Sequence, residues 1–525
     1  MKEIFKNINT SLVIETAIYR AAIYFNWFLF AIVTSFFIKT DLTKGKLISL
    51  LLVLALIYII RTGFKFLYKK VVNDAYHNIK HNIELNIFEK TKIIKSSNIE
   101  NLDKEAFANK SLEVSYNITK IISDIIEYII PCIIGTIILF HFINKVSFIL
   151  GILSFICLIA LLVSRYNNPA YHEKLNNTNY NDLFKDYILK IETIRKLNIF
   201  DFCYKKLNDN KENDIVILKD NGAVLYNDLT FSNILVGYLF VLIVATLLIV
   251  SNIMTAFGLM ISIIVVMLKL KKLLYMVNPT ISNIITTVNN LKELDSYFKE
   301  REELSYFSDW KKINIKDGVY RYLDTNKTIK IPEFELVKGD ACGIIGKSGE
   351  GKSTLLNVLA GIYKFESGNI FYDGTVDIRY PEHMYISKEV KTLKLSLRDN
   401  LCLGNIYTDE DLISLIKEIG LMDWYNSLAK GLDTYIDEKY VILNDDIIGK
   451  INIIRCIVSN KTLYLLDDPS NGMNIESEKL VANMIKKYFK KQAFIIVSHR
   501  PIFTTICKKT YFIKDHTLLP KETLL

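Results

Sequence analysis

The stretch of residues 346–354 limits what the surrounding chain can fold into. It reads Gly-Lys-Ser-Gly-Glu-Gly-Lys-Ser-Thr and fits the phosphate-binding pattern G-x-x-x-x-G-K-[ST]. An apolar run, 341–345, precedes it, and a run of helix formers, 355–360, follows it. This order predicts a strand, a glycine-rich loop and a helix, which is the context that the pattern requires.

The residue types in this stretch suit a polyphosphate. Glycines let the backbone wrap around anionic oxygens, so that N–H groups and the positive helix N-terminus converge on them. We expect Lys352 to reach the β- and γ-phosphates of ATP and Ser353 to place its hydroxyl on Mg²⁺. The residues predicted to bind the nucleotide here are Gly346, Lys347, Ser348, Gly349, Glu350, Gly351, Lys352, Ser353 and Thr354.

The composition indicates a part that lies in a membrane. Of the 525 residues 50% are hydrophobic, and the mean hydropathy of +0.22 is high for a soluble protein. The formal net charge is +9, but Lys and Arg cluster beside apolar runs, as they do in membrane proteins. We therefore expect a lipid bilayer as partner and no nucleic acid. The seven cysteines form no C-x-x-C pair, so neither a disulfide framework nor a zinc site is predicted.

Six apolar runs come in three close pairs, and we interpret them as six membrane-spanning helices, the second of which continues amphipathically toward Lys70. The segments between the pairs hold most of the charge and keep helical spacing. We therefore predict long cytosolic helical extensions and both termini in the cytosol. The runs are Ala17 to Ile38 with Leu47 to Ile60, Ile121 to Ile143 with Val146 to Ser164, and Phe231 to Val250 with Ile253 to Leu268.

These features divide the chain into two predicted domains. Residues 1–304 form an α-helical transmembrane domain with six spans, and residues 305–525 form an α/β P-loop nucleotide-binding domain whose first strand begins near Ile313. Asp124 and Glu127 begin the third span three residues apart, so we expect them on one helix face as candidate substrate contacts. Alternatively they lie on the cytosolic extension, solvated or paired with lysine.

Two further apolar stretches of the second domain end in residues suited to nucleotide chemistry. Residues 463–467 predict a strand that presents Asp467 as the carboxylate on the Mg²⁺ side. Residues 493–497 predict another strand, which leads to Ser498 and His499. A histidine at the carboxyl end of such a strand is placed to contact a γ-phosphate.

With these features the chain resembles a half-transporter of the ATP-binding cassette (ABC) superfamily. The resemblance is to the exporter type (type IV fold), with six spans fused to one nucleotide-binding domain, and it covers essentially the whole chain. It implies that Tyr322 stacks on adenine, that Asp467 binds Mg²⁺ and that His499 is the switch histidine. It also implies two intracellular coupling loops, with coupling helices near residues 98–108 and 196–205.

Several motif positions depart from the family pattern. The signature that resembles L-S-G-G-Q falls on residues 443–447, Leu-Asn-Asp-Asp-Ile, where only the leucine matches. The glutamine of the loop that resembles Y-V-S-Q falls on Lys388, and the catalytic glutamate falls on Asp468. The aspartate of the D-loop falls on Asn474.

The departures predict a site that binds ATP but hydrolyses it slowly. Asn444, Asp445 and Asp446 would face a γ-phosphate held by the opposing subunit, and two carboxylates at about 4–6 Å would repel it. Alternatively these residues cap their helix favourably. Asp468 has about 1.5 Å less reach than glutamate. Lys388, which we assign to catalysis with Asp468, lacks the amide oxygen that coordinates Mg²⁺.

We therefore predict a half-transporter that uses ATP and Mg²⁺ and needs a second ABC half-transporter, preferably a different one. Its expected role is ATP-driven export of a small peptide or amphipathic compound across the cell membrane. The alternatives are a non-pumping regulatory or immunity-type ABC membrane protein and a lipid flippase. The Ile-, Lys- and Asn-rich composition is typical of an AT-rich genome and favours a bacterial source.

Overall fold

The computed structural model divides into two compact units. The first comprises Met1–Ile87, Asn109–Thr178 and Lys211–Ser296, and the second comprises Phe88–Ala108, Asn179–Asn210 and Tyr297–Leu525. The predicted fourth, fifth and sixth spans lie outside the described residues. The structure describes residues 5–38, 44–95, 102–131, 179–209, 283–298, 305–322, 327–377, 379–387, 389–437 and 439–520, with a few single positions between them.

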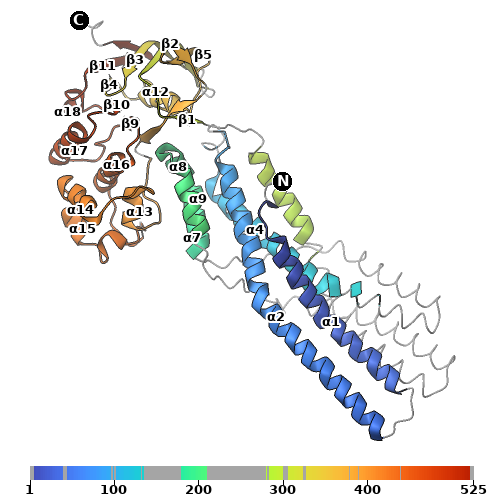
Figure 1. Ribbon diagram of the computed structural model, residues 1–525. Helices are drawn as coiled ribbons and strands as arrows, with labels where there is room; N and C mark the ends of the chain where they lie inside the picture. Colours follow the sequence, from blue (N-terminus) through green and yellow to red (C-terminus); the bar gives the residue numbers. More distant parts are fainter. Residues whose placement is uncertain are drawn as a thin grey trace. The chain divides into compact units, whose positions relative to one another are not determined.

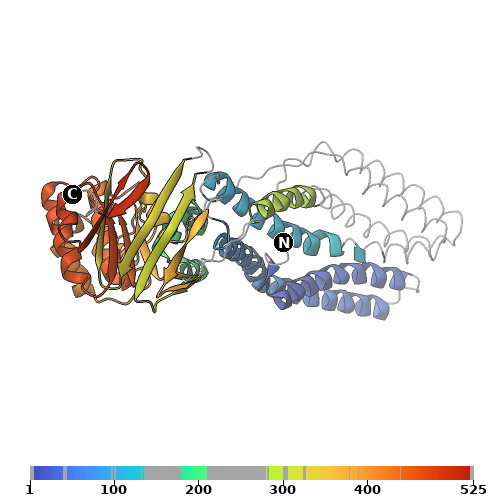
Figure 2. The same ribbon diagram turned by 90° about the horizontal axis from the view of Figure 1, so that it is seen from above.

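The first unit is helical. Its described helices are α1 (Thr10–Ile38), α2 (Lys44–Thr91), α4 (Lys104–Asp124) and the π-helix η2 (Ile125–Ile129), of which α2 and α4 extend into the second unit. α1 and α2 lie side by side (Figures 1 and 2). Among the described residues, one helical stretch, 48–91, is long and apolar enough to cross a membrane, with a mean hydropathy of 2.1 over its best 18 residues. The count of six spans stays a prediction.

The π-helix η2 directs the two predicted substrate contacts to different partners. Thr280 donates a hydrogen bond to Asp124 Oδ2 at 3.1 Å. Glu127 accepts hydrogen bonds from Arg20 in α1 at 3.2 Å and from the Tyr68 hydroxyl in α2 at 2.5 Å. Asp124 is the last residue of α4 and Glu127 lies in η2, so the helix changes from α to π geometry between them, and their role as substrate contacts stays a prediction. Each carboxylate is therefore bonded to its own neighbour.

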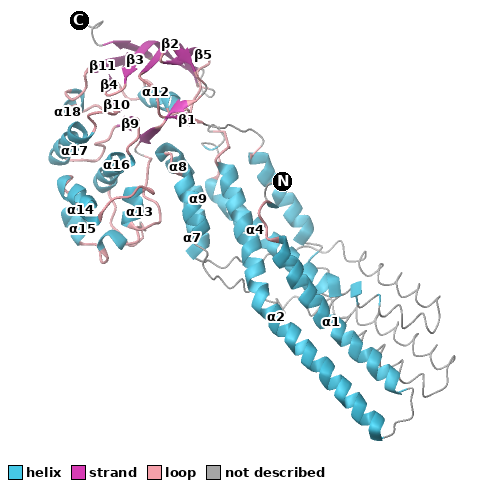
Figure 3. Ribbon diagram, viewed as in Figure 1, coloured by secondary structure: helices cyan, strands magenta, loops and turns pink. Residues whose placement is uncertain are grey.

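The second unit is built on a ten-stranded sheet with the order β6-β5-β2-β3-β12-β11-β4-β10-β9-β8, while β1 and β7 pair separately (Figure 3). The strands are β1 (Tyr306–Phe307), β2 (Lys312–Arg321), β3 (Thr328–Val337), β4 (Ala341–Gly346), β5 (Ser367–Tyr372), β6 (Thr375–Val376), β7 (Tyr380–Pro381), β8 (His383–Ile386), β9 (Leu463–Asp467), β10 (Ala493–Val497), β11 (Lys509–Lys514) and β12 (Thr517–Pro520). The neighbours β11, β4, β10, β9 and β8 are parallel. β4, β9 and β10 are almost wholly buried, which explains their continuous apolar sequences.

Helices pack against the parallel strands of this sheet, and several begin at side-chain caps. Ser396 accepts a hydrogen bond from the amide of Asp399 at the start of α13, and Thr408 accepts one from Asp411 at the start of α14. The helical first unit and the α/β second unit agree with the predicted fold class. The helices of the second unit are α7 (Asn179–Leu189), α8 (Ile191–Leu197), α9 (Phe200–Asp209), α12 (Lys352–Leu359), α13 (Leu397–Cys402), α14 (Asp409–Glu418), α15 (Met422–Asn426), η3 (Gly431–Asp433), α16 (Asp445–Ser459), α17 (Ile475–Tyr488) and α18 (Pro501–Thr504).

Candidate functional site

The carboxyl ends of β4, β10 and β9 lie next to one another because these strands are parallel neighbours. Residues around these ends line a cavity of about 420 Å³. Asn444, Asp445 and Asp446 are not among its lining residues, and Lys388 lies outside the described residues. The residues predicted from the sequence that do line it are Tyr322, Ser348, Gly349, Gly351, Lys352, Ser353, Thr354, Asp467, Asp468 and His499.

Glycines shape the loop between β4 and α12. Gly349 and Gly351 have φ angles of +82° and +107°, in the region that favours glycine. A Cβ at Gly351 would lie 2.1 Å from Ile329 Cδ1, so any larger residue there would displace the loop. At Gly349 the corresponding space is open. The backbone between the two glycines can therefore approach a ligand closely.

The ammonium of Lys352 is held inside this loop by backbone oxygens. Its Nζ donates to the carbonyl of Gly346 at 2.9 Å and to that of Lys347 at 2.7 Å. The residue is 7% exposed, and burial lowers the pKa of its amine. A buried positive charge whose hydrogen-bond acceptors are neutral carbonyls favours an anionic ligand. The geometry therefore supports the predicted role of Lys352 in binding phosphate.

Asp467 ends β9 next to the start of α12. Burial raises the pKa of its carboxyl, and hydrogen bonds from the hydroxyls of Ser353 and Tyr385 lower it. The Tyr385 hydroxyl lies 3.3 Å from Asp467 Oδ2. A carboxylate beside a hydroxyl suits Mg²⁺, which completes its octahedral shell with phosphate oxygens and water. Within the described residues no three His, Cys, Asp or Glu side chains form a metal cluster, so a metal here would need those outside ligands.

Asp468, the predicted general base, has a left-handed backbone with φ +54°. Its amide donates to the carbonyl of Val497 at 2.8 Å, which joins the end of β9 to β10. Asp and Asn adopt this conformation more readily than longer side chains do. Two features thus set the reach of this carboxylate: its short side chain and a backbone conformation that suits aspartate.

Replacement of Asp468 tests whether its reach limits hydrolysis. Asp468→Glu restores about 1.5 Å of length and is expected to raise the ATPase rate of the assembled transporter several-fold. The gain should be smaller than the roughly 100-fold that a 1 Å correction can give, because glutamate is strained in the left-handed region. Asp468→Asn keeps the backbone and should change the rate little. Phosphate release at saturating Mg-ATP measures both, and a large loss with asparagine without a gain with glutamate contradicts the idea.

Tyr322 and His499 line the same cavity from positions just beyond the ends of β2 and β10. The Tyr322 hydroxyl hydrogen-bonds with Thr354, and its ring meets that of Tyr320 edge-on, with centroids 5.2 Å apart. These contacts fix the orientation of the ring. His499 is exposed and follows the buried Ser498 at the end of β10. Their assignment as adenine-stacking and switch residues stays a prediction.

The predicted signature residues begin α16 and satisfy its N-terminus. Asn444 is the N-cap, and its Oδ1 accepts from the amide of Ile447 at 2.8 Å. Asp446 pairs with Lys450 one turn later, at 2.9 Å, and Lys450 is only 5% exposed. Asp445 is exposed. Asn444 therefore caps the helix, as the alternative interpretation predicts, and the charge of Asp446 is balanced by Lys450 of the same helix.

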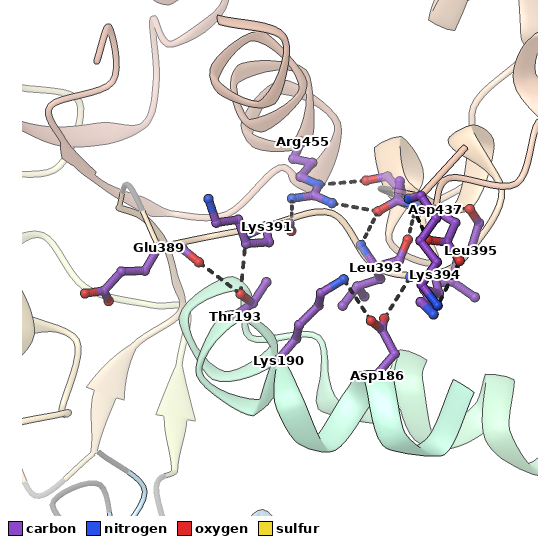
Figure 4. A network of polar contacts seen from close by, with 12 residues as sticks. Asp186, Lys190, Thr193, Glu389, Lys391, Leu393, Lys394, Leu395, Asp437 and Arg455 are labelled. Carbon is purple, nitrogen blue, oxygen red and sulfur yellow. Dashed lines mark hydrogen bonds and ion pairs between the residues drawn. The ribbon is translucent and has the colours of Figure 1, made fainter. Parts of the chain in front are cut away.

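Sequence reasoning missed a polar network around the irregular segment 389–395, which joins β8 to α13 (Figure 4). The amide of Lys391 donates to Thr193 Oγ1 of α8 at 3.3 Å. The amide of Lys394 donates to Asp186 Oδ2 of α7 at 2.8 Å. These partners are about 200 positions apart in the chain, so no local motif signals them.

Arg455 in α16 binds the same segment. Its Nη1 donates to the carbonyl of Lys391 at 3.0 Å and to Asn452 Oδ1 at 2.8 Å. Its Nε and Nη2 donate to the carbonyl and the Oδ1 of Asn400, both at 2.8 Å. The side chain is fully buried, and this burial lowers the pKa of the guanidinium to about 10, which leaves it charged at neutral pH. These acceptors are uncharged, so the arginine acts as a structural centre for backbone and amide oxygens.

Comparisons with known proteins agree with this site. Residues 329–471 match a family model described as ABC transporter. The chain is 34% identical over 181 residues to a serine protease/ABC transporter B family protein of Dictyostelium discoideum, covering 33% of this chain and 10% of that protein. It is 30% identical over 196 residues to the alpha-hemolysin translocation ATP-binding protein HlyB of Escherichia coli O157:H7, covering 36% of this chain and 28% of that protein. The matches thus span about a third or less of these relatives.

Two further likenesses are to a flippase and to the structure of an exporter. Over 198 residues the chain is 25% identical to an ATP-dependent lipid A-core flippase of Vibrio vulnificus, covering 36% of this chain and 34% of the flippase. The structure of a bacterial Atm1-family ABC exporter with ATP bound has a similar fold, with a TM-score of 0.66 and 14% identity over 98% of this chain and 95% of that one. Residues 329–471 are thus similar to the ABC transporter family, and the fold of the chain is similar to that of an ABC exporter.

Proposed function

We propose that the chain binds ATP together with Mg²⁺ and hydrolyses it slowly on its own. The observation that carries this proposal is the meeting of Lys352 and Asp467 in one cavity, at the carboxyl ends of neighbouring parallel strands. Lys352 and the loop amides would hold the β- and γ-phosphates, and Ser353 and Asp467 would hold Mg²⁺. When bound, Mg²⁺ neutralises charge that develops on the transferred phosphoryl group.

ATP turnover is proposed to drive export of a small peptide or amphipathic compound across the cell membrane. The exporter fold supports transport, and the names of two relatives concern alpha-hemolysin translocation and lipid A-core flipping. Six spans with both termini in the cytosol would place the cassette on the ATP side. Asp124 and Glu127 are proposed substrate contacts, and a polar substrate would compete with Thr280 and Arg20 for them.

A second half-transporter, preferably a different one, is the proposed partner. In such a dimer the start of α16 faces the phosphates held by the opposing cassette. Asp445 is exposed there, whereas Asp446 already pairs with Lys450. The repulsion of phosphate that this chain contributes therefore comes mainly from Asp445. A partner with an intact signature and catalytic glutamate would supply one competent site.

Restoring the signature should strengthen ATP-driven closure. In the triple variant Asn444→Ser, Asp445→Gly and Asp446→Gly, the acidic charge is removed and glycine amides are offered to phosphate. Cysteine cross-linking across the cassette interface, with and without ATP, measures closure. Asp446→Asn alone is the matched control and should act weakly, because that carboxylate is already balanced by Lys450. Tight ATP-dependent closure of the unmodified homodimer would show that the aspartates do not repel the nucleotide.

One experiment separates transport from its alternatives. The chain and its partner are reconstituted in liposomes, and the ATPase rate is measured while candidate peptides, amphipathic compounds or lipids are added. Stimulation by a compound that also moves across the bilayer supports the exporter, and the same result with a lipid supports a flippase. ATP binding without stimulation or movement supports the regulatory or immunity-type alternative, for which the acidic Asp445 is the structural argument.

A further inference from the structure

A lysine of the α7–α9 segment enters the nucleotide cavity. Lys196 lies in α8, and its side chain is 10% exposed. Its Nζ donates to Ser387 Oγ at 3.1 Å and pairs with Glu389 Oε2 at 2.5 Å. Lys196 lines the same cavity as Lys352, although it lies more than 150 positions earlier in the chain. The cavity therefore contains a cation that the cassette sequence does not supply.

The charge of Lys196 lies close to the predicted Mg²⁺ ligand. Its Nζ is 5.3 Å from the centre of the Tyr385 ring, and the Tyr385 hydroxyl donates to Asp467 at 3.3 Å. Lys196 is thus within electrostatic reach of the groups that would hold the metal and the phosphates.

The ion pair of Lys196 is asymmetric in its exposure to water. The lysine side chain is nearly buried, whereas the side chain of Glu389 is 57% exposed. A largely solvated carboxylate stabilises its partner weakly, and a phosphate bearing several charges is a stronger acceptor for a buried ammonium. An anion entering the cavity can therefore replace Glu389 as the partner of Lys196.

The position of Lys196 depends on contacts of α8 with α2 and α4 as well as on its contacts with the nucleotide-binding domain. Glu192 pairs with Lys104 of α4. Arg195 donates to the carbonyls of Thr91 at 2.9 Å and Lys92 at 3.0 Å, at the end of α2. Together with the contacts in Figure 4, these bonds hold α8 between residues 91–104 and the irregular segment 389–395. Any movement of α8 therefore moves this cation relative to the nucleotide cavity.

We propose that Lys196 is a nucleotide-binding residue, which exchanges Glu389 for a phosphate oxygen of the bound nucleoside triphosphate. This inference rests on the proposed ATP site and adds to it a contact supplied by the α7–α9 segment. Occupancy of the cavity by a triphosphate then changes the bonding of α8 directly. The alternative is that Lys196 only joins α8 to Ser387 and Glu389.

Nucleotide affinities of the full chain in detergent or nanodiscs test this assignment. Trinitrophenyl-ATP serves as the fluorescent probe, and ATP, ADP and adenosine compete with it. Lys196→Met keeps the length of the side chain and removes the charge, and it should weaken ATP about tenfold, as expected for one hydrogen bond to a charged group. The affinity for ADP should fall less, and the affinity for adenosine should not change. Lys196→Arg should restore most of the ATP affinity.

Two further variants separate binding from structure. Glu389→Gln changes an exposed side chain and removes the carboxylate partner of Lys196, so it should raise the affinity for ATP about threefold. The same change should have no effect on ATP affinity in the Lys196→Met background. Lys206→Met removes an equal charge from α9, where Lys206 pairs with Asp399 at 2.9 Å, and should leave all affinities unchanged. Unchanged ATP affinity in Lys196→Met, or equal losses for ATP and adenosine, overturns the assignment. If the unmodified chain binds no nucleotide, the proposed ATP site fails instead.

Discussion

Replacement of Lys352 by alanine is expected to lower the affinity for Mg-ATP by about 100-fold or more, because two or more charge-assisted hydrogen bonds to phosphate are lost. The ammonium is positioned for this role by the carbonyls of Gly346 and Lys347, and it is nearly buried. Equilibrium titration of the full chain with a fluorescent nucleotide measures the loss. The unmodified chain should bind tightly yet turn over well below the roughly 1–10 s⁻¹ of an ordinary enzyme.

Lys347→Ala is the matched control for this variant. Lys347 lies in the same loop and carries the same charge, but it is exposed and contributes its backbone to the loop contacts. Its side chain should therefore matter little, and affinity should stay within a few-fold of the unmodified chain. Binding of ATP by Lys352→Ala at near-normal affinity would remove the basis of the phosphate site. A turnover of 1–10 s⁻¹ by the chain alone would instead refute the expected slow hydrolysis.

The second large effect is expected at Arg455, where Arg455→Leu should destabilise the cassette by about 3–5 kcal/mol. Four hydrogen bonds to oxygens of Asn400, Lys391 and Asn452 are lost together, and the three to Asn400 and Asn452 are buried. Burial makes the loss larger, because an unsatisfied buried acceptor keeps its full desolvation penalty. Urea unfolding of the full chain, followed by tryptophan fluorescence to which the buried Trp310 contributes, reports this change.

Arg398→Leu provides the comparison. Arg398 pairs with Asp409 and Asp433, but it is partly exposed and its carboxylate partners are largely solvated. Such surface pairs contribute at most about 1 kcal/mol, so the urea midpoint should shift only slightly. Equal shifts in the two variants would mean that the network around Arg455 is not the structural centre described above.

The nucleotide site was predictable because its chemistry is local in the sequence. Lys352 and Ser353 stand where the glycine-rich loop meets α12, and the strand before the loop and the helix after it are largely buried apolar runs that the sequence pattern indicates clearly. Asp467 and His499 follow strands of the same kind, so parallel pairing brings them to one edge. These residues could be assigned without knowledge of any tertiary contact.

Other features depend on contacts that the sequence does not display. Lys196 meets Ser387 across 191 positions, and nothing near either residue signals the pair. The π turn at η2, between Asp124 and the residues that follow it, was not predicted, because the helical periodicity of the sequence does not reveal a local π turn. The pairing of Asp446 with Lys450 follows ordinary i,i+4 spacing, so the sequence alone can predict it.

The network around the irregular segment 389–395 affects how freely this part of the chain can change during evolution. Thr193, Asp186 and Arg455 bind the peptide groups of Lys391 and Lys394 rather than their side chains. Most substitutions at these two positions therefore leave those three hydrogen bonds intact. Proline is the exception, because it has no amide hydrogen to donate to Thr193 or Asp186. The constraint on positions 391 and 394 is therefore that proline is excluded, and no particular side chain is required.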